Sequence, residues 1–426
     1  MELVLASNFD DALVDGVADL PVSTFFGNFP VTMTGGGRPP RILPNVDPDR
    51  FRDHVGRIHR SGRQFYATLN SNDLALKEYR PGFAQAFARE VGELLDLGVD
   101  GLVVALPLLI ETIRDEFPSV PISVSTFARV RSVTQADYFR ALGADTIVIE
   151  EANRDLRLLR GLVRSGARVE LLVNQTCLPS CPYRAHHLNT SSLAAQPEQS
   201  CPRFEYPLIE CGLEMVRDPA KLIASILVRP EDLPVYEEIG VTRFKVSGRN
   251  RSTSWLLRAA RAYAQRHYDG NLLDILSFVQ VRGPRAVLQE VERRPDATPA
   301  VRPLREAFEL LRDVTIDNSA YPENFLRRVT ATNCAHLSCS ECGYCAGVAE
   351  KVLRIGGQPP SEYRPPEGLP SPVSLLPFLG EGNEEPIAGP RARAKSGTAP
   401  SSRRHHAVPA GRTATGHRSE NAVTAR

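Results

Sequence analysis

Short runs of apolar and β-branched residues alternate with amphipathic segments through roughly the first 250 residues, and this alternation limits the possible folds more than any other feature. The eight expected strands are Glu2 to Ser7, Val22 to Gly27, Gln64 to Leu69, Gly101 to Leu106, Pro121 to Thr126, Asp145 to Glu150, Val169 to Asn174 and Arg243 to Gly248. Apolar residues at helical spacing predict helices between them, such as Asp49 to Arg60, Phe83 to Leu97 and Leu156 to Arg164. We therefore predict an α/β fold, a TIM-like (β/α)8 barrel, with an open doubly wound sheet as the alternative.

Polar residues stand at the carboxyl ends of most of these strands, where a barrel places its active site. We predict Glu150 as a candidate catalytic residue and Asn70 as a substrate-binding residue. Lys245 and Arg249 are expected to bind carboxylates of a substrate, because a dianion in a barrel mouth needs fixed cations. The Gly-rich stretch TGGGRPPR adds Arg38 as a further anion-binding candidate, and a mobile lid is the alternative role for that stretch.

The eight cysteines fall into two groups of four, which predicts two metal centres. The first group is Cys177, Cys181, Cys201 and Cys211, and the second is Cys334, Cys339, Cys342 and Cys345. The second group reads C-x4-C-x2-C-x2-C, a spacing that suits one iron–sulfur cluster or one structural zinc ion. Disulfides are less favoured, because the chain is long and its start, MELVLASNFDD, lacks the features of a signal segment. We therefore expect a cytoplasmic protein.

The connection after the seventh predicted strand, residues 176–217, is long for a compact barrel, and such loops are usually functional or disordered. It carries the first cysteine group together with Arg184, His186 and His187. Arg184 is a candidate for binding an anionic substrate. His186 and His187 are candidate catalytic residues because imidazole exchanges protons near neutral pH, and the alternative is that they lie at the surface or beside a cluster.

Composition and charge predict the organisation of the rest of the chain. Of the 426 residues, we expect a barrel over 1–275, a helical, cysteine-rich extension over 276–365, and a Pro-rich linker with a basic tail over 366–426. From Arg391 onward there are eight basic residues, one acid and almost no large apolar side chains, so we predict that the tail is disordered. The longest apolar stretch is too short to span a bilayer, so we expect no membrane partner. The net charge of +1 gives no strong indication of a nucleic-acid partner.

Several segments resemble the peptidase U32 family of collagenase-like proteins. They are LVLASNFDDALVDGVADL, PISVSTFARV with ALGADTIVIEEANRDL, the loop CLPSCPYRAHH, and RPEDLPVYEEIGVTRFKVSGRNRSTSWLLRAARAY, together spanning about Met1 to Ile275. Members that resemble this barrel carry a 4Fe-4S cluster on the loop after the seventh strand and support oxygen-independent hydroxylation of RNA or of a ubiquinone precursor, with prephenate implicated as oxygen donor. The resemblance thus implies a 4Fe-4S cluster on Cys177, Cys181, Cys201 and Cys211, although Cys177 and Cys181 stand closer together than in the peptidase-type signature. It also implies a small-molecule or RNA substrate and a second U32-like protein as a partner.

These features predict an iron–sulfur-dependent enzyme that modifies a small aromatic or nucleobase-like substrate, with oxygen-independent hydroxylation as the leading hypothesis. The second cysteine group would hold another 4Fe-4S cluster or a zinc ion. Two alternatives stay open, a collagenase-like peptidase and a non-catalytic iron–sulfur assembly or electron-transfer partner. The peptidase is less favoured, because the sequence has neither HExxH nor GxSxG and every cysteine belongs to a ligand-like set.

Overall fold

The computed structural model describes residues 1–29, 31–198, 206–278, 298–332, 334, 336–369, 371 and 373. The chain divides into two units, Met1–Gly382 and Asn383–Arg426. The second unit, and with it nearly all of the predicted basic tail, lies outside the described residues, as does Cys201.

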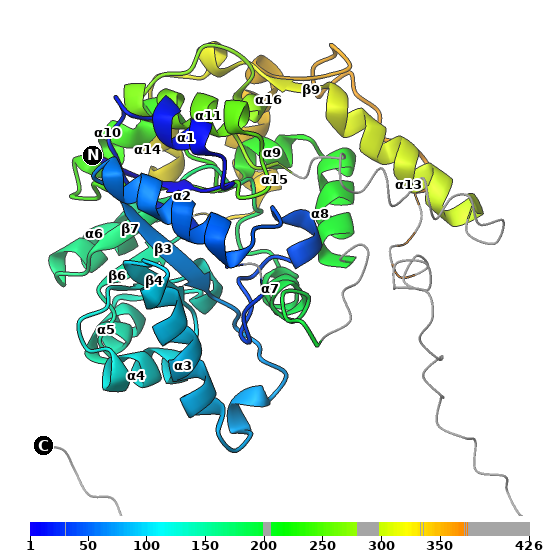
Figure 1. Cartoon of the computed structure of the whole chain (residues 1–426). Helices are drawn as coiled ribbons and strands as arrows, with labels where there is room; N and C mark the ends of the chain where they lie inside the picture. The colour runs from blue at the N-terminus through cyan, green and yellow to red at the C-terminus, as the bar shows by residue number, and fades with distance from the viewer. Residues whose placement is uncertain are drawn as a thin grey trace, which may run out of the picture. The chain divides into compact units, whose positions relative to one another are not determined.

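Eight parallel strands close into a barrel in which each strand pairs with the next along the chain (Figure 1). They are β1 (Glu2–Ala6), β2 (Val22–Gly27), β3 (Gln64–Leu69), β4 (Gly101–Val104), β5 (Ile122–Val124), β6 (Thr146–Ile149), β7 (Val169–Leu172) and β8 (Arg243–Val246). β8 pairs with β1 from Glu2 opposite Arg243 to Leu5 opposite Val246. This closure confirms the predicted barrel and excludes the open sheet. Several strands end one or two residues earlier than predicted, where the chain turns into the polar mouth.

Helices follow the strands and surround the barrel (Figure 1). They are α1 (Asp11–Gly16), α2 (Pro48–Arg60), α3 (Phe83–Asp96), α4 (Pro107–Glu116), α5 (Val133–Ala141), α6 (Leu156–Arg164), α7 (Arg184–Leu193), α8 (Tyr206–Arg217), α9 (Ala220–Ala224), α10 (Leu233–Glu237) and α11 (Thr253–Gln265). Several begin at a side-chain cap, as the sequence suggests. Asp47, Ser132, Asp155 and Ser252 each accept a hydrogen bond from a backbone N–H in the first turn.

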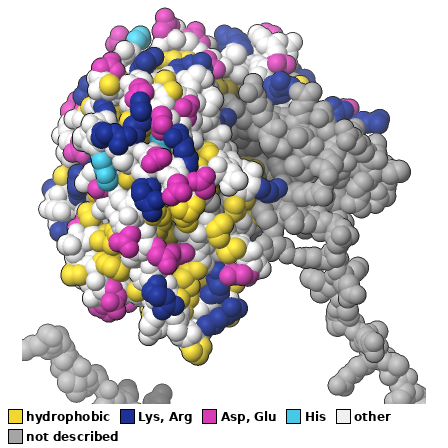
Figure 2. All heavy atoms as spheres, in the orientation of Figure 1, with side chains coloured by type: hydrophobic (Ala, Val, Ile, Leu, Met, Phe, Trp, Pro, Cys, Tyr) yellow, Lys and Arg dark blue, Asp and Glu magenta, His cyan; other side chains and the backbone are white. Residues whose placement is uncertain are grey.

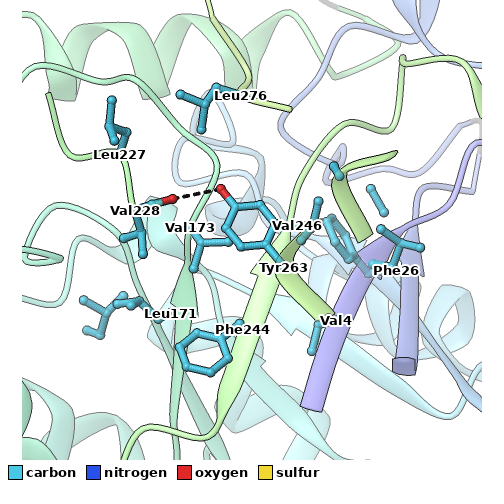
Figure 3. Close-up of a cluster of buried hydrophobic side chains, with 14 of the residues drawn as sticks. Val4, Phe26, Leu171, Val173, Leu227, Val228, Phe244, Val246, Tyr263 and Leu276 are labelled. Carbon is cyan, nitrogen blue, oxygen red and sulfur yellow. Dashed lines mark hydrogen bonds between the residues drawn. The ribbon is translucent and has the colours of Figure 1, made fainter. Parts of the chain in front are cut away.

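The main core lies between the strands and the outer helices. Figure 3 shows this layer, where Leu171 of β7 and Phe244 and Val246 of β8 lie near Tyr263 of α11, and all four side chains are fully buried. The Tyr263 hydroxyl donates a 2.9 Å hydrogen bond to the backbone oxygen of Val228, which satisfies its polar end. Because side chains alternate along a strand, the residues between these apolar ones face the barrel interior.

Beyond the barrel the chain forms α13 (Thr298–Leu310), α14 (Phe325–Ala331), α15 (Cys339–Cys342) and α16 (Tyr344–Val352). It also forms a small antiparallel sheet of β9 (Val314–Ile316) and β10 (Leu353–Ile355), which the prediction of a helical extension did not include. α16 packs against α9, and the Tyr363 hydroxyl donates to the backbone oxygen of Val216 at 2.9 Å, so the extension is joined to the segment that follows the cysteine loop. Within the described ranges, no helix is both long and apolar enough to cross a membrane.

Candidate functional site at the barrel mouth

A cavity of about 120 Å³, lined by both polar and apolar side chains, opens at the carboxyl ends of the strands, and it brings together most of the residues that the sequence pointed to. Its lining includes all five predicted substrate-binding residues, two of the three predicted catalytic residues and one cysteine: Arg38, Asn70, Arg184, Lys245, Arg249, Glu150, His187 and Cys177. His186 is different, because its side chain is exposed and lies beside the ring of Tyr206, at 6.3 Å between centroids.

The Gly-rich segment covers one side of this cavity and is packed tightly against it. Gly35 and Gly37 have φ values of 73° and 62°, and a side chain at Gly37 would meet Phe127 and Asn70. A Cβ at Gly36 would collide with the side-chain amide of Asn28. The glycines are therefore needed for close approach, and the segment delivers Arg38 to the cavity wall.

Arg249, just after β8, is a partly buried cation held by neutral groups. Its Nη1 donates to Thr68 Oγ1 at 2.8 Å, to the backbone oxygen of Gly36 at 2.9 Å, and to Asn28 Oδ1. Among the described residues no carboxylate is paired with Arg249 or with Arg38. Burial, and then the nearby charge of Arg38, lower the pKa of Arg249 to about 9. Two guanidinium groups without acidic partners make this wall suited to an anion.

Lys245 also lines the cavity, but its charge is already neutralised. Its ammonium donates to Glu170 Oε1 at 2.7 Å and lies 4.0 Å from the ring centroid of Phe26. The other oxygen of Glu170 accepts from Arg243 Nε at 2.7 Å, so one fully buried carboxylate pairs with two cations. Sequence reasoning missed Glu170, although an acid within the apolar strand VELL is a signal for such a pair.

Asn70 is placed to recognise a polar group. Its Nδ2 donates to Ser125 Oγ at 2.9 Å, whereas its buried Oδ1 has no hydrogen-bond partner among the described residues. A buried acceptor without a partner costs free energy, so a donor that enters the cavity would be stabilised at this position.

Arg184, at the start of α7, connects the cysteine loop to the end of β6. Its Nη1 donates to Cys177 Sγ at 3.2 Å, its Nε donates to Glu151 at 3.2 Å, and its Nη2 is paired with Glu150. Glu150 is therefore bound to Arg184 in this structure rather than free to act as a base.

Three of the four thiols in the first cysteine group gather at this place. Cys177 lines the cavity, Cys211 lies on α8, and burial raises the pKa of both, with Cys211 at about 12. Burial also raises the pKa of Cys181, and the Cys181 and Cys177 thiols are each close enough to Cys211 to interact with it electrostatically.

The second cysteine group lies on α15, α16 and the segment before them. Burial and then the nearby thiols of Cys342 and Cys339 raise the pKa of Cys334, and burial also raises the pKa of the Cys345 thiol, a rise that the charge of nearby Arg154 partly offsets. Arg154 follows Glu150 and Glu151 by only a few residues, so one short segment after β6 reaches both cysteine groups.

The thiols suit a soft metal or an iron–sulfur cluster by their chemistry. In the described ranges no three Cys, His, Asp or Glu side chains converge closely enough to hold a metal ion as they are placed. All seven described cysteines are free thiols. In the first group, the Cys177 and Cys181 thiols each interact electrostatically with Cys211, and in the second group the other three thiols each interact with Cys334. The donor sets therefore fit such a group once the side chains turn toward it.

A closed parallel barrel with a cation-lined cavity at the carboxyl ends of its strands defines a (β/α)8-barrel protein with a mouth-centred binding site. More specifically, residues 40–270, more than half of the chain, match the model for peptidase family U32. The chain belongs to peptidase family U32.

Two curated relatives and one solved structure are similar to this chain. An uncharacterized protease of Methanocaldococcus jannaschii is 24% identical over 324 residues, covering 75% of this chain and 86% of the relative. The tRNA hydroxylation protein P1 of Bacillus subtilis is 24% identical over 277 residues, covering 62% of this chain and 64% of the relative. A solved U32 peptidase structure is 19% identical, covers 58% of this chain and 93% of its own, and has a TM-score of 0.45.

Proposed function

We propose that this protein is an iron–sulfur-dependent enzyme that performs oxygen-independent hydroxylation, or a related modification, of a small aromatic or nucleobase-like substrate. The observation that carries the proposal is the pairing of an anion site, Arg38 and Arg249, with the half-buried thiol of Cys177 in one cavity. The relative in Bacillus subtilis is named for tRNA hydroxylation, which supports RNA as the source of the substrate base.

Each part of the cavity has a role in this proposal. Arg38 and Arg249 bind the carboxylates of a co-substrate such as prephenate, and Asn70 Oδ1 accepts a hydrogen bond from the substrate. His187 also lines this cavity, and its proposed role is to transfer protons to or from the substrate.

The cluster would be held by Cys177, Cys181, Cys201 and Cys211. When bound, a 4Fe-4S cluster supplies one-electron chemistry or a substrate-binding iron. Arg184 positions the Cys177 ligand through its hydrogen bond to the sulfur.

A second centre on Cys334, Cys339, Cys342 and Cys345 belongs to the same proposal. Its C-x2-C-x2-C portion, from Cys339 to Cys345, matches the spacing of a ferredoxin-type run and favours a cluster over zinc. Free thiols in both groups suit the reducing cytoplasm, which we propose as the location. A second U32-like chain as partner also remains a proposal.

Metal analysis tests the proposal directly. The protein is purified without oxygen, and iron, sulfide and zinc are measured with a visible spectrum on the wild type, Cys181→Ala and Cys342→Ser. About eight irons in the wild type and about four in each variant are expected for two cubane clusters. About four irons and one zinc, with the zinc lost only in Cys342→Ser, identify the second centre as structural zinc. A wild type without iron and sulfide overturns the hydroxylase proposal and favours the peptidase alternative.

A further inference from the structure

Three side chains at the carboxyl end of β1 form a chain of hydrogen bonds that the proposed function does not use. Ser7 follows β1, Asp11 begins α1, and His54 lies in the middle of α2. Ser7 Oγ is 2.9 Å from His54 Nε2, and His54 Nδ1 is 2.8 Å from Asp11 Oδ1. This is the arrangement of a Ser–His–Asp triad. Ser7 would be the nucleophile, His54 the base hydrogen-bonded to its hydroxyl, and Asp11 the carboxylate on the other ring nitrogen.

The backbone around Ser7 also resembles that of a nucleophilic serine. The chain passes from strand β1 through a sharp turn into helix α1, and Phe9 in that turn has a φ of 59°, a value that bulky residues rarely adopt. Serine hydrolases of the α/β type also place their serine on a strand-to-helix turn, although there the strained residue is the serine itself and here it is Phe9, two residues later. The backbone N–H of Phe9 donates to Ser7 Oγ at 3.0 Å, which leaves the hydroxyl proton directed to His54.

The charges around the three residues suit proton transfer. Burial lowers the pKa of His54, and the opposing effect of Asp11 is smaller, so the ring is neutral at pH 7 and can accept a proton. Burial alone would raise the pKa of Asp11, but hydrogen bonds from Arg50 and His54 hold it below its ordinary value. Arg50 also donates to the backbone oxygen of Phe9 at 3.0 Å, and thereby fixes the turn.

A second cavity, of about 290 Å³, gives access to this site. Its lining includes Ser7, Phe9, Asn28 and Arg249, of which Arg249 is shared with the first cavity. Ser7 itself is fully buried, so only a group that enters this cavity can reach its hydroxyl. The guanidinium of Arg249 provides positive charge in the wall, where an oxyanion or an acidic substituent of the substrate would be stabilised.

We propose that Ser7, His54 and Asp11 form a second, metal-independent catalytic site that hydrolyses an ester or amide of an acidic acyl group. Ser7 Oγ attacks the carbonyl carbon while its proton passes to His54 Nε2, and Asp11 holds the ring through Nδ1–H. The bond to the leaving group then breaks as His54 returns the proton to that group. Water, deprotonated in turn by His54, cleaves the acyl ester and regenerates the Ser7 hydroxyl.

The experiment is covalent labelling of the full chain with diisopropyl fluorophosphate, followed by mass spectrometry of its peptides. We expect one adduct, on Ser7, and none in Ser7→Ala. Labelling should slow by about 100-fold or more in His54→Gln and in Asp11→Asn, the usual contribution of a general base. His59→Gln is the matched control, because His59 lies on the same helix and its Nε2 contacts Asp100 at 2.8 Å. It should label at the wild-type rate.

A structural network gives a different result. If the hydrogen bond from Ser7 only packs α2 against β1, one of two results is expected. Either Ser7 of the wild type stays unlabelled, or His54→Gln and Asp11→Asn label as fast as the wild type. Each of these results overturns the proposal. Asp11 is partly exposed, so Asp11→Asn tests the site even where His54→Gln fails to fold. Labelling is repeated after the iron has been chelated. An unchanged rate of labelling at Ser7 shows that this site works without the proposed cluster, so the two proposals can fail separately.

Discussion

Nη1 of Arg184 donates a hydrogen bond to Sγ of Cys177 across 3.2 Å, while the same guanidinium is paired with Glu150 and Glu151. The loop that follows β7 is thereby fixed to the end of β6 at the position of its first cysteine. The fold thus supplies a hydrogen-bond partner for this sulfur, which is the positioning role proposed for Arg184 toward a cluster ligand.

Replacing Arg184 should weaken retention of the first metal centre. In Arg184→Met, the Cys177 sulfur loses its donor and Glu150 loses its cation, while Glu151 keeps Arg129 and Arg131. We therefore expect a 10- to 100-fold loss of metal affinity, the usual effect of removing an outer partner. Iron content and the rate of bleaching in air are the measurements. Arg217→Met is the control, because Arg217 lies on α8 in a half-exposed pair with Glu214. Equal iron content in the two variants contradicts the prediction.

Arg249 should control the binding of a dicarboxylate. Arg249→Met is expected to weaken binding of prephenate by about 10-fold or more, since a hydrogen bond to a charged group contributes about 1.5–3 kcal/mol. The pKa of Arg249 is about 9 without ligand, so the cation is present below that pH and binding weakens as the pH rises above it. Calorimetric titrations between pH 7 and 10 measure this, with the exposed Arg52→Met as control. Equal affinity in Arg249→Met and the wild type removes Arg249 from the site.

The pair of Glu170 with Lys245 and Arg243 should be essential to stability. Glu170→Gln leaves buried Lys245 without a carboxylate and leaves Arg243 with Glu2 alone, so we expect a loss of about 3–5 kcal/mol in the free energy of unfolding. The control is Glu238→Gln, which breaks an exposed pair with Arg327 and should cost under about 1 kcal/mol. Urea unfolding at pH 7 compares the two, and equal losses contradict the prediction.

The same variant should show a defined pH dependence. Burial alone would raise the pKa of Glu170, but Lys245 and Arg243 hold it below its ordinary value of 4.5 in the folded protein. The stabilisation is therefore complete above about pH 4.5 and is lost as the pH falls further. The difference between wild type and Glu170→Gln should shrink between pH 5 and pH 3.

The sequence predicted the barrel well because its periodic signal is local. All eight strands and the helices α2, α3 and α6 lie within a few residues of their predicted ranges, since apolar spacing and end glycines are read from neighbouring positions. The cavity residues at strand ends could be predicted for the same reason, because a closed barrel brings all carboxyl ends together.

Pairing between distant residues could not be predicted in this way. Lys245 was expected to bind substrate, yet it is paired with Glu170, which lies 75 positions away. The contact between Ser7 and His54 spans 47 positions and follows no sequence motif. Net charge does not predict ion pairs either. Figure 2 shows acidic and basic side chains interspersed over one face of the molecule, and a net charge of +1 does not reveal which of them are paired.

The last prediction concerns Glu90 of α3, which anchors the segment leading to Arg38. Its Oε1 accepts a 2.7 Å hydrogen bond from the backbone N–H of Met33, and Lys77 donates to the backbone oxygen of the same residue. Burial raises the pKa of Glu90 to about 7, and the hydrogen bond from Met33 offsets only part of that rise. A carboxyl with a raised pKa binds its proton more tightly in the folded state, so the free energy of unfolding falls as the pH rises from about 4.5 to 7.

Glu90→Gln removes this ionisation and keeps an oxygen that can accept from Met33. We therefore expect equal or slightly lower stability than the wild type at pH 4.5, and a gain on the order of 2 kcal/mol at pH 8. Urea unfolding at the two pH values measures the difference. Glu111→Gln, which removes an exposed carboxylate on α4, is the control and should change stability little at either pH. A gain of the same size at both pH values would mean that Glu90 acts by packing and not by its charge, since only an ionised carboxylate becomes more costly to bury as the pH rises.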